Sequence, residues 1–428
     1  MNKDMKLLVK KLGVNAKNSF SQMLDASTLQ KNQALSDLSE EIYKNSERII
    51  LANEMDILQA ERDGFDEAFI DRLTIDQKVI DSMRSGLSAL INLPDPVGKI
   101  DDLREQPSGI MVGSMRVPIG VVLIIYESRP NVTIDAAALC LKSGNAVILR
   151  GGSESLNSNT ELVKLCKKVL KKNALPQNAI QIVPKTDRSI VGKLIEYSEM
   201  IDLIIPRGGK SLIEKISKDA LIPVIKHLDG ICHVYIDDDA DLVKATNITL
   251  NSKTQRLATC NTLETLLISE KISKRILPKL ALMLMKKNVE LRVCEKSKEI
   301  IKALSFEYSS AAKIATARDW KTEYLSNILS IKIVTNIEAA IKHISKYGSQ
   351  HTDSIITENH HKAMLFLRKV DSASVMVNAS TRFADGFQYG LGAEIGISTN
   401  KLHARGPVGL EGLTSVKWIV LGNGQIRV

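Results

Sequence analysis

Cys260 lies in a polar stretch whose residue types suit a covalent nucleophile. Residues 251–264 read Asn-Ser-Lys-Thr-Gln-Arg-Leu-Ala-Thr-Cys-Asn-Thr-Leu-Glu. A thiol in such a loop is accessible to a substrate, and the neighbouring cations Lys253 and Arg256 would stabilise its thiolate. A loop cysteine without a catalytic role fits the same residues, so the local sequence leaves both interpretations open.

The other four cysteines, Cys140, Cys166, Cys232 and Cys294, have apolar neighbours, which is typical of buried and unreactive thiols. The total of five is odd and no Cys-x-x-Cys pair occurs. Neither a disulfide framework nor a zinc site follows from this pattern, and we predict no metal site.

Two segments carry paired glycines beside an arginine, and both are candidates for phosphate binding. They are Arg150-Gly151-Gly152-Ser153 and Arg207-Gly208-Gly209-Lys210-Ser211. Glycine lets the backbone approach an anion, a following helix offers N–H groups at its positive end, and arginine adds a fork for phosphate. Tight turns between strand and helix need glycine as well, so one pair alone would favour that simpler reading. Two such pairs favour nucleotide binding, although the Gly-x-Gly-x-x-Gly pattern is absent.

The elements that must position these residues alternate between strand and helix. Residues 1–90 have helical periodicity up to a Pro/Gly break at 94–98, and residues 110–112 and 115–117 flank Gly113-Ser114 as an expected hairpin. Residues 120–126 form an apolar run typical of a strand buried on both faces. We then expect a helix at 132–142, a strand at 146–150, a helix at 155–172, strands at 180–183 and 201–205, and a helix at 187–197 between them.

This alternation predicts an α/β fold with parallel sheets and right-handed crossovers. A second α/β region begins near Ile231, with a helix from about Ala240, the Cys260 loop, a strand at 265–268 and a helix at 271–287. The expected domains are residues 1–230, which include a hairpin near 109–117, then residues 231–385, and finally residues 386–428, which return to the first domain. Residues 416–428 alternate enough to form a strand, which we expect to take part in oligomerisation.

The composition excludes several classes of function. The 428 residues carry 58 basic and 49 acidic side chains, a formal charge of +9 that suits a phosphorylated substrate or cofactor. Aromatic residues make up 4%, which leaves few platforms for stacking bases, so we expect no nucleic-acid partner. Residues 1–14 are interrupted by charges and no later segment is long and apolar enough to span a bilayer. We therefore predict a cytoplasmic protein without a membrane partner.

Six longer motifs resemble the gamma-glutamyl phosphate reductases, or glutamate-5-semialdehyde dehydrogenases, of the aldehyde dehydrogenase superfamily. They cover nearly the whole chain in the family's order and lie at residues 117–131, 142–154, 255–264, 378–386, 391–400 and 403–410. One departure is Leu257-Ala258-Thr259 before the cysteine, where the family commonly has proline and small residues. The departure changes the stiffness of the loop and leaves the nucleophile in place.

The resemblance implies an aldehyde-dehydrogenase-like fold. Its expected parts are an NADP-binding domain with a parallel sheet (1–230), a catalytic domain that carries Cys260 (231–385), and a small oligomerisation element. It also implies the second step of proline biosynthesis, in which NADPH reduces L-glutamyl 5-phosphate to glutamate 5-semialdehyde and phosphate. Because the acyl phosphate is labile, a separate glutamate 5-kinase is a candidate partner. A homo-oligomer is expected.

In this family Cys260 is the nucleophile, and its backbone N–H is one donor to the oxyanion. Alignment on Pro130 puts Ser128 where relatives have the asparagine that supplies a second donor, and Asn131 is the other candidate. Asn131 would equally serve as an N-cap for the helix from Val132. Oxidising relatives have a water-activating glutamate where this chain has His227. Its replacement fits phosphate rather than water as the acyl partner, and His227 then either meets the leaving phosphate or is structural.

The resemblance also bears on the cofactor and on the substrate carboxylate. Arg150 and Ser153 stand where relatives have a lysine and a glutamate that grip the ribose, which favours NADP over NAD because the acidic group is missing. The remaining cofactor residues are those of the glycine pairs. Arg382 and Arg405 are the candidates for the α-carboxylate, each with a surface ion pair as the simpler reading, and Arg129 and Arg256 complete the expected substrate-binding set. The alternatives are another aldehyde or CoA-acylating dehydrogenase of the superfamily, or a non-catalytic scaffold.

Overall fold

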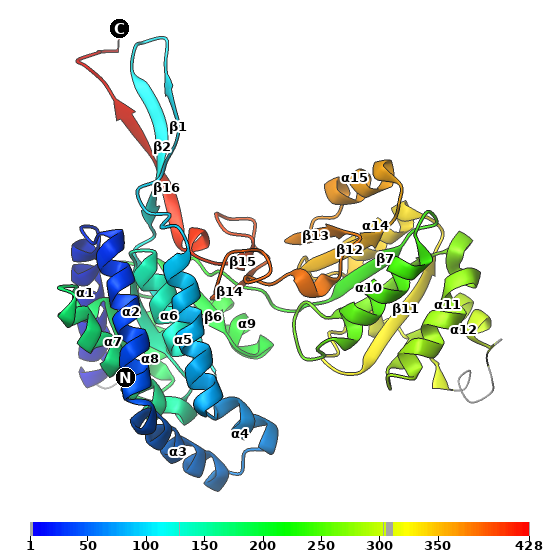
Figure 1. Ribbon diagram of the computed structural model, residues 1–428, viewed down its shortest axis with the longest axis horizontal. Coiled ribbons are helices and arrows are strands. Elements are labelled where there is room, and N and C mark those ends of the chain that lie inside the picture. Colours follow the sequence, from blue (N-terminus) through cyan, green and yellow to red (C-terminus); the bar gives the residue numbers. More distant parts are fainter. Residues whose placement is uncertain (1–2, 128, 303, 305–310, 428) are drawn as a thin grey trace. The chain divides into compact units, whose positions relative to one another are not determined.

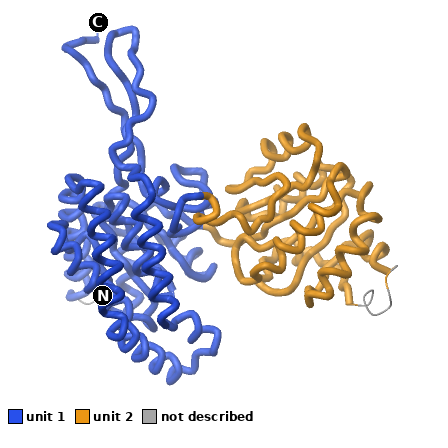
Figure 2. The backbone as a smooth tube through the Cα atoms, in the orientation of Figure 1, with its two compact units in different colours: residues 1–226, 390–428 blue, residues 227–389 orange. Residues whose placement is uncertain are grey.

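The chain forms two compact units in a computed structural model that describes residues 3–127, 129–302, 304 and 311–427. Unit 1 comprises residues 1–226 and 390–428, and unit 2 comprises residues 227–389 (Figure 2). Unit 2 extends four residues beyond each end of the expected second domain, residues 231–385. Residues 227–230 belong with unit 2 because the backbone of Gly230 packs directly against that of Cys260. No helix in the described ranges is long and apolar enough to cross a membrane.

Unit 1 is built on a parallel four-stranded sheet of order β5-β4-β3-β6 (Figure 1). Strand β3 is buried at all six positions, as its apolar sequence predicts. The strands are β3 (Val121–Tyr126), β4 (Ala146–Arg150), β5 (Ile180–Ile182) and β6 (Leu203–Arg207). The helices are α1 (Lys3–Met23), α2 (Thr28–Lys44), α3 (Ser46–Arg62), α4 (Glu67–Leu73), α5 (Gln77–Asn92), α6 (Val132–Lys142), α7 (Leu156–Lys172), α8 (Ser189–Leu194) and α9 (Lys210–Asp219).

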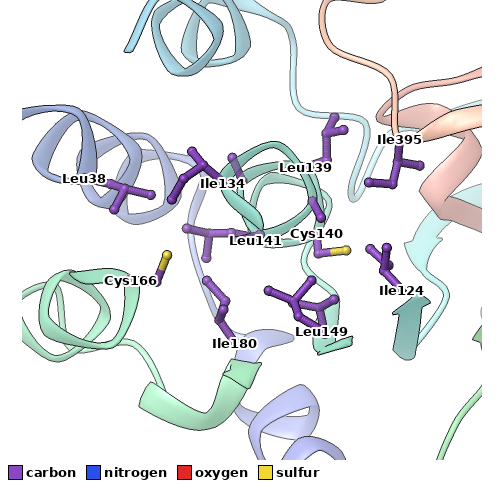
Figure 3. Close-up of a cluster of buried hydrophobic side chains, with 14 of the residues drawn as sticks. Leu38, Ile124, Ile134, Leu139, Cys140, Leu141, Leu149, Cys166, Ile180 and Ile395 are labelled. Carbon is purple, nitrogen blue, oxygen red and sulfur yellow. The ribbon is translucent and has the colours of Figure 1, made fainter. Parts of the chain in front are cut away.

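Helix α6 lies in the middle of the largest core cluster, as Figure 3 shows. Its residues from Ala136 to Lys142 are all buried, and Cys140 among them is fully enclosed. Cys166 on α7 lies in the same core, so both cysteines are the buried thiols that their neighbours predict. Burial raises the pKa of both thiols, which leaves them protonated and unreactive.

The expected hairpin exists, but its turn is not Gly113-Ser114. Strand β2 (Met111–Pro118) runs straight through these residues, and it pairs with β1 (Ile100–Glu105) and with β16 (Thr414–Leu421). The turn lies at residues 106–109, where Gly109 has φ +79°. Gly113 faces a bulge in β1, and a Cβ there would come within 3.0 Å of the Leu103 backbone. A close approach, rather than a turn, therefore requires this glycine.

Unit 2 contains a parallel seven-stranded sheet of order β10-β9-β11-β8-β7-β12-β13, which confirms the second α/β region. The strands are β7 (Cys232–Ile236), β8 (Leu263–Ser269), β9 (Glu290–Val293), β10 (Lys313–Ile314), β11 (Ile328–Val334), β12 (Thr352–Ile356) and β13 (Ser374–Val377). The helices are α10 (Leu242–Thr254), α11 (Glu270–Met285), α12 (Glu295–Ile301), α14 (Ile337–Tyr347) and α15 (His360–Lys369). A short two-stranded ladder of β14 (Gly396–Ser398) and β15 (Gly406–Val408) belongs to unit 1.

One face of the unit 2 sheet buries a histidine without a charge partner. The His343 ring on α14 lies 5.5 Å from the Trp320 ring and 5.6 Å from the His233 ring. Burial, with smaller contributions from His233, Lys332 and Lys346, lowers the pKa of His343 from 6.5 to about 3. The folded protein therefore keeps this imidazole neutral, whereas the unfolded chain protonates it near pH 6.5.

This difference predicts a pH-dependent cost that can be isolated by substitution. As pH falls from 6.5 towards 4.5, His343 should reduce the free energy of unfolding by about 1.4 kcal/mol per pH unit, because the unfolded state binds the extra proton. Urea unfolding followed by Trp320 fluorescence in a Trp418→Phe background measures it. The difference between wild type and His343→Gln should shift in the variant's favour across this range. A difference that stays constant, as expected for the exposed control His361→Gln, would contradict the assignment.

Candidate functional site

The polar candidates of unit 1 gather at one edge of its sheet, because parallel strands present their carboxyl ends together. Strand β3 ends at Tyr126 and is followed by Glu127, β4 ends at Arg150, and β6 ends at Arg207. Strands β4 and β6 flank β3 on either side. The two glycine pairs therefore lie at the same sheet edge, as the sequence predicts.

The first glycine turn is held by its own arginine. Arg150 is 8% exposed, and its guanidinium donates to the carbonyls of Gly151 and of Thr186, the latter at 3.0 Å. Its Nε has no partner among the described residues. Gly151 is required by packing, since a Cβ there would lie 2.2 Å from the Asn159 amide nitrogen. Arg150 thus holds the turn through its guanidinium, and the exposed Arg188, directly before α8, is a nearby cation that the sequence did not indicate.

The helix after the first glycine turn does not offer the expected N–H groups. Asp56 of α3 is 3% exposed and accepts from the backbone N–H groups of Asn157 at 3.1 Å and Ser158 at 2.8 Å. The side chains of the same two residues also donate to it. A buried carboxylate with four hydrogen bonds neutralises this helix end permanently. The N–H groups of Asn157 and Ser158 are therefore already taken, and the role of the first glycine turn in cofactor binding stays a prediction.

At the second glycine turn, an exposed carboxylate lies against the backbone. The N–H of Gly209 donates to the Glu127 carboxylate at 2.9 Å, and a Cβ at Gly208 would meet that same carboxylate at 2.6 Å. Glu127, Gly208, Gly209, Lys210 and Ser211 are all exposed. Since α9 begins at Lys210, a carboxylate here occupies the place where a phosphate oxygen would bind to the helix start. Unlike Asp56, Glu127 can swing away into solvent.

The two candidates for the second oxyanion donor have different outcomes. Ser128 lies outside the described residues. Asn131 stands at the N-cap position of α6, but its side chain makes no capping hydrogen bond and instead lies 3.5 Å from the Asp135 carboxylate. The N-cap reading is therefore wrong in its chemistry. Burial raises the pKa of Asp135 to about 6, which nearby Arg207 opposes.

In unit 2, Cys260 lies in the loop between α10 and β8, as the sequence predicts. Asn261 donates to the carbonyl of Ala384 at 3.0 Å, and Thr262 donates to the carbonyl of Arg256 at 2.7 Å. These hydrogen bonds tie the end of the loop to the segment that contains Ala384 and to the loop's own start at Arg256. Cys260 is half-buried, and Cys232 is fully buried as expected. The expectation of a buried thiol is wrong for Cys294, which is half-buried and whose thiol contacts Ser297 at 3.2 Å.

The start of β7 presses against the back of the Cys260 loop. A Cβ on Gly230 would lie 1.9 Å from the carbonyl oxygen of Cys260, so no other residue fits without moving the loop. The Cys232 thiol donates to that same carbonyl at 3.2 Å. The N–H of Gly230 is held by the Glu323 carboxylate at 2.8 Å. These contacts fix the backbone from which the Cys260 side chain projects.

The cations near Cys260 divide into two kinds. Lys253 is fully buried and forms an ion pair with Glu264 at 2.8 Å, so it is a structural residue and not the expected partner of the thiolate. Arg382 donates to Gln255 at 2.8 Å and to the Thr259 hydroxyl at 2.7 Å, which ties it to the loop rather than to a surface carboxylate. Burial lowers the pKa of Arg382, as does the charge of Arg256, while the Cys260 thiolate raises it. Arg256 is exposed.

Two histidines lie beside the thiol. One ring nitrogen of His227, one of His351 and the Cys260 sulfur all lie within 4.8 Å of one another. The two rings meet edge to face, with centroids 5.5 Å apart. Burial, with a smaller effect of His227, lowers the pKa of His351 to about 3, so its imidazole is neutral at physiological pH. Its Nδ1 lies 2.8 Å from the Thr352 hydroxyl, and its Nε2 has no partner among the described residues.

The sequence reasoning found His227 but missed His351, which lies 91 positions from Cys260 and directly before β12. No local motif marks it, and only the parallel pairing of β7 with β8 and β12 brings it near the thiol. The remaining expected residues are Arg129, which is exposed, and Arg405, which is half-buried, both in unit 1.

The contact between Gly230 and Cys260 generates a prediction about stability and thiol reactivity. Gly230→Ala should destabilise the protein by about 1–3 kcal/mol, because the added methyl group must displace the Cys260 backbone. It should also change the rate at which iodoacetamide alkylates Cys260. The matched control is Gly192→Ala in α8, where a Cβ meets nothing within 4 Å. A Gly230→Ala protein as stable and as reactive as that control would refute the close contact.

Comparisons with known proteins agree with this architecture. The aldehyde dehydrogenase family model matches residues 8–292. A gamma-glutamyl phosphate reductase structure from Thermotoga maritima is 43% identical, covers 98% of this chain and 100% of its own, and has a TM-score of 0.94. The Saccharomyces cerevisiae reductase is 31% identical over 98% of each chain, with a TM-score of 0.53. An acetylating aldehyde dehydrogenase from Geobacillus thermoglucosidasius, at 16% identity, shares only the fold, with a TM-score of 0.67. The chain belongs to the aldehyde dehydrogenase family and, within it, to the group of the gamma-glutamyl phosphate reductases.

Proposed function

We propose that the chain reduces L-glutamyl 5-phosphate to L-glutamate 5-semialdehyde and phosphate with NADPH, the second step of proline biosynthesis. The observation that carries the proposal is the full-length similarity to a gamma-glutamyl phosphate reductase, together with a half-buried Cys260 that lies close to two histidines in a loop held by hydrogen bonds. The chain is accordingly an oxidoreductase that acts on an aldehyde.

The chemistry begins when the Cys260 thiol loses its proton and the sulfur attacks the acyl-phosphate carbonyl. A C–S bond forms, the C–O bond to phosphate breaks, and inorganic phosphate leaves a thioester on Cys260. In this proposal His227, which lies near the thiol, would donate a hydrogen bond to the departing phosphate, and the Cys260 backbone N–H would donate to the oxyanion. NADPH, when bound at the unit 1 sheet edge, would supply the hydride that reduces the thioester carbon. The C–S bond then breaks, the aldehyde departs, and the sulfur recovers its proton.

The unit 1 sheet edge fits a phosphorylated dinucleotide. The exposed turn at Gly208 and Gly209, followed by Lys210 and Ser211 at the start of α9, would hold a phosphate, because Gly209 already donates to a carboxylate there. Arg188 in the exposed loop beside Arg150 would receive a 2′-phosphate, which supports NADP over NAD. In unit 2, the exposed Arg256 is our candidate for binding the substrate carboxylate, because Arg382 is hydrogen-bonded to Gln255 and Thr259 of the loop.

Further parts of the proposal concern the setting of the enzyme. The sheet of β1, β2 and β16 extends away from the helices of unit 1 (Figure 1) and exposes Trp418 at 79% and Val420 at 58%, which suits pairing with a second copy. A glutamate 5-kinase partner would shorten the exposure of the labile acyl phosphate to water. A reducing, cytoplasmic location suits a thiol nucleophile.

The reverse reaction tests the proposal directly. The purified chain should reduce NADP with pyrroline-5-carboxylate, the cyclised aldehyde, only when inorganic phosphate is present. Cys260→Ser should lower the rate by about a thousand-fold or more, because the covalent route is lost. Cys294→Ser, which changes the other half-buried thiol, should leave the reaction rate unchanged. A rate that needs CoA instead of phosphate, or neither, would favour the other dehydrogenases, and a folded chain with no rate would favour a scaffold.

Glu127 generates a separate prediction about cofactor affinity. Because its carboxylate occupies the Gly209 N–H, Glu127→Gln should bind NADPH about three- to ten-fold more tightly by removing a competing charge. Quenching of NADPH fluorescence measures the affinity, and Glu196→Gln, an exposed ion-pair residue of unit 1, is the matched control. Weaker binding in Glu127→Gln would mean that the carboxylate holds the cofactor instead.

A further inference from the structure

We propose that Cys260, His227 and His351 form a binding site for a thiophilic divalent cation of the zinc type, which blocks the nucleophile reversibly. The sequence gives no sign of such a site, because the three residues are far apart in the chain and follow no ligand spacing. The unit 2 fold brings one potential ligand atom from each within 4.8 Å of the others. Two imidazoles and one thiolate are the ligand types that zinc prefers over oxygen ligands.

The state of His351 supports this site independently of the distances. The side chain is 1% exposed, and its Nε2 has no partner among the described residues. A buried polar atom without a partner is costly, and a metal bond would satisfy it. The Nδ1 contact with the Thr352 hydroxyl orients the ring, as outer hydrogen bonds do for metal-bound histidines.

The three ligands leave a fourth tetrahedral position open, which an anion or water would complete. Arg256 and Arg382 place positive charge near Cys260, as their mutual influence and that of the thiolate on the pKa of Arg382 indicate. These charges oppose a bare cation and favour an anion as the fourth ligand. Because Arg382 is bonded to Gln255 and Thr259, the loop can keep its position while the Cys260 and His227 side chains close on the metal.

The other cluster of potential ligands in unit 2 contrasts with this one. Asp237, Asp238 and Asp239 also lie close together, but the Lys362 ammonium contacts all three carboxylates, at 3.0 Å for Asp237 and 2.9 Å for Asp239. The Lys362 ammonium therefore already serves as the cation of the aspartate cluster. In the Cys260 cluster, by contrast, the buried Nε2 of His351 has no partner in the part of the chain that the structure describes.

Metal binding does not depend on the proposed function, whereas inhibition does, so the two need separate readouts. Metal-free protein is titrated with Co²⁺ at pH 7 and then with Zn²⁺. We expect one Co²⁺ per chain, with a thiolate-to-cobalt charge-transfer band and the visible bands of a tetrahedral site, all displaced by Zn²⁺ and unaffected by Mg²⁺. Zn²⁺ should also slow the alkylation of Cys260 by iodoacetamide, and a chelator should restore it.

Variants identify the ligands. Cys260→Ser should abolish the charge-transfer band, and His351→Asn and His227→Asn should each weaken binding at least about ten- to a hundred-fold. Cys294→Ser and His361→Asn, which change the other half-buried thiol and an exposed histidine, should bind as wild type does. If His351→Asn does not fold, the half-buried His227 carries the test. Wild type without the band, or Cys260→Ser with wild-type affinity, overturns the site. A band in a protein that shows no phosphate-dependent turnover overturns the proposed function and leaves the site standing.

Discussion

The contact between Gly230 and the carbonyl of Cys260 is the constraint on which the geometry of the catalytic unit depends. At this point two backbones meet with no room for a single carbon atom between them. The Glu323 carboxylate accepts a hydrogen bond from the Gly230 N–H, and the Cys232 thiol donates one to the Cys260 carbonyl, so both backbones are held in place. The position of Cys260, the proposed nucleophile, therefore depends on backbone packing directly before β7, and its own loop needs no stiffening proline. This explains how Leu257-Ala258-Thr259 can replace the stiffer residues common in the family.

Charge is arranged differently in the two units, and the difference follows from burial. Carboxylates cover helix starts in unit 1: a buried Asp56 closes that of α7, and an exposed Glu127 covers that of α9 in a displaceable way. In unit 2 the buried ion pair of Lys253 and Glu264 takes one cation away from the site, and Arg382 ties itself to the loop. Burial raises the pKa of Glu264 to about 7, while the Lys253 ammonium and a hydrogen bond from the Leu325 N–H favour its charged form. The groups left to act on a ligand are the exposed or half-buried ones.

Much of the fold and part of the candidate site were predictable because they depend on local sequence patterns. Apolar runs predicted β3 and β4, paired glycines predicted the sheet edge, and the polar loop with its family motif predicted Cys260. What failed depended on distant partners. Gly113 looked like a turn because its bulge partner Leu103 lies in another strand, and the start of α7 looked open because Asp56 is about 100 residues away. Asn131 looked like an N-cap because its hydrogen bond to Asp135 depends on side-chain orientation. His351 had no signal at all, since only the order of three strands brings it to the thiol.

The central claim, that Cys260 carries the acyl group, can be tested by trapping the thioester. The chain is mixed with pyrroline-5-carboxylate and NADP in the absence of phosphate and examined by intact-protein and peptide mass spectrometry. The account predicts one glutamyl adduct per chain, located on the peptide that contains Cys260 and released when phosphate is added. Full turnover with no adduct, or an adduct on another residue, would contradict it.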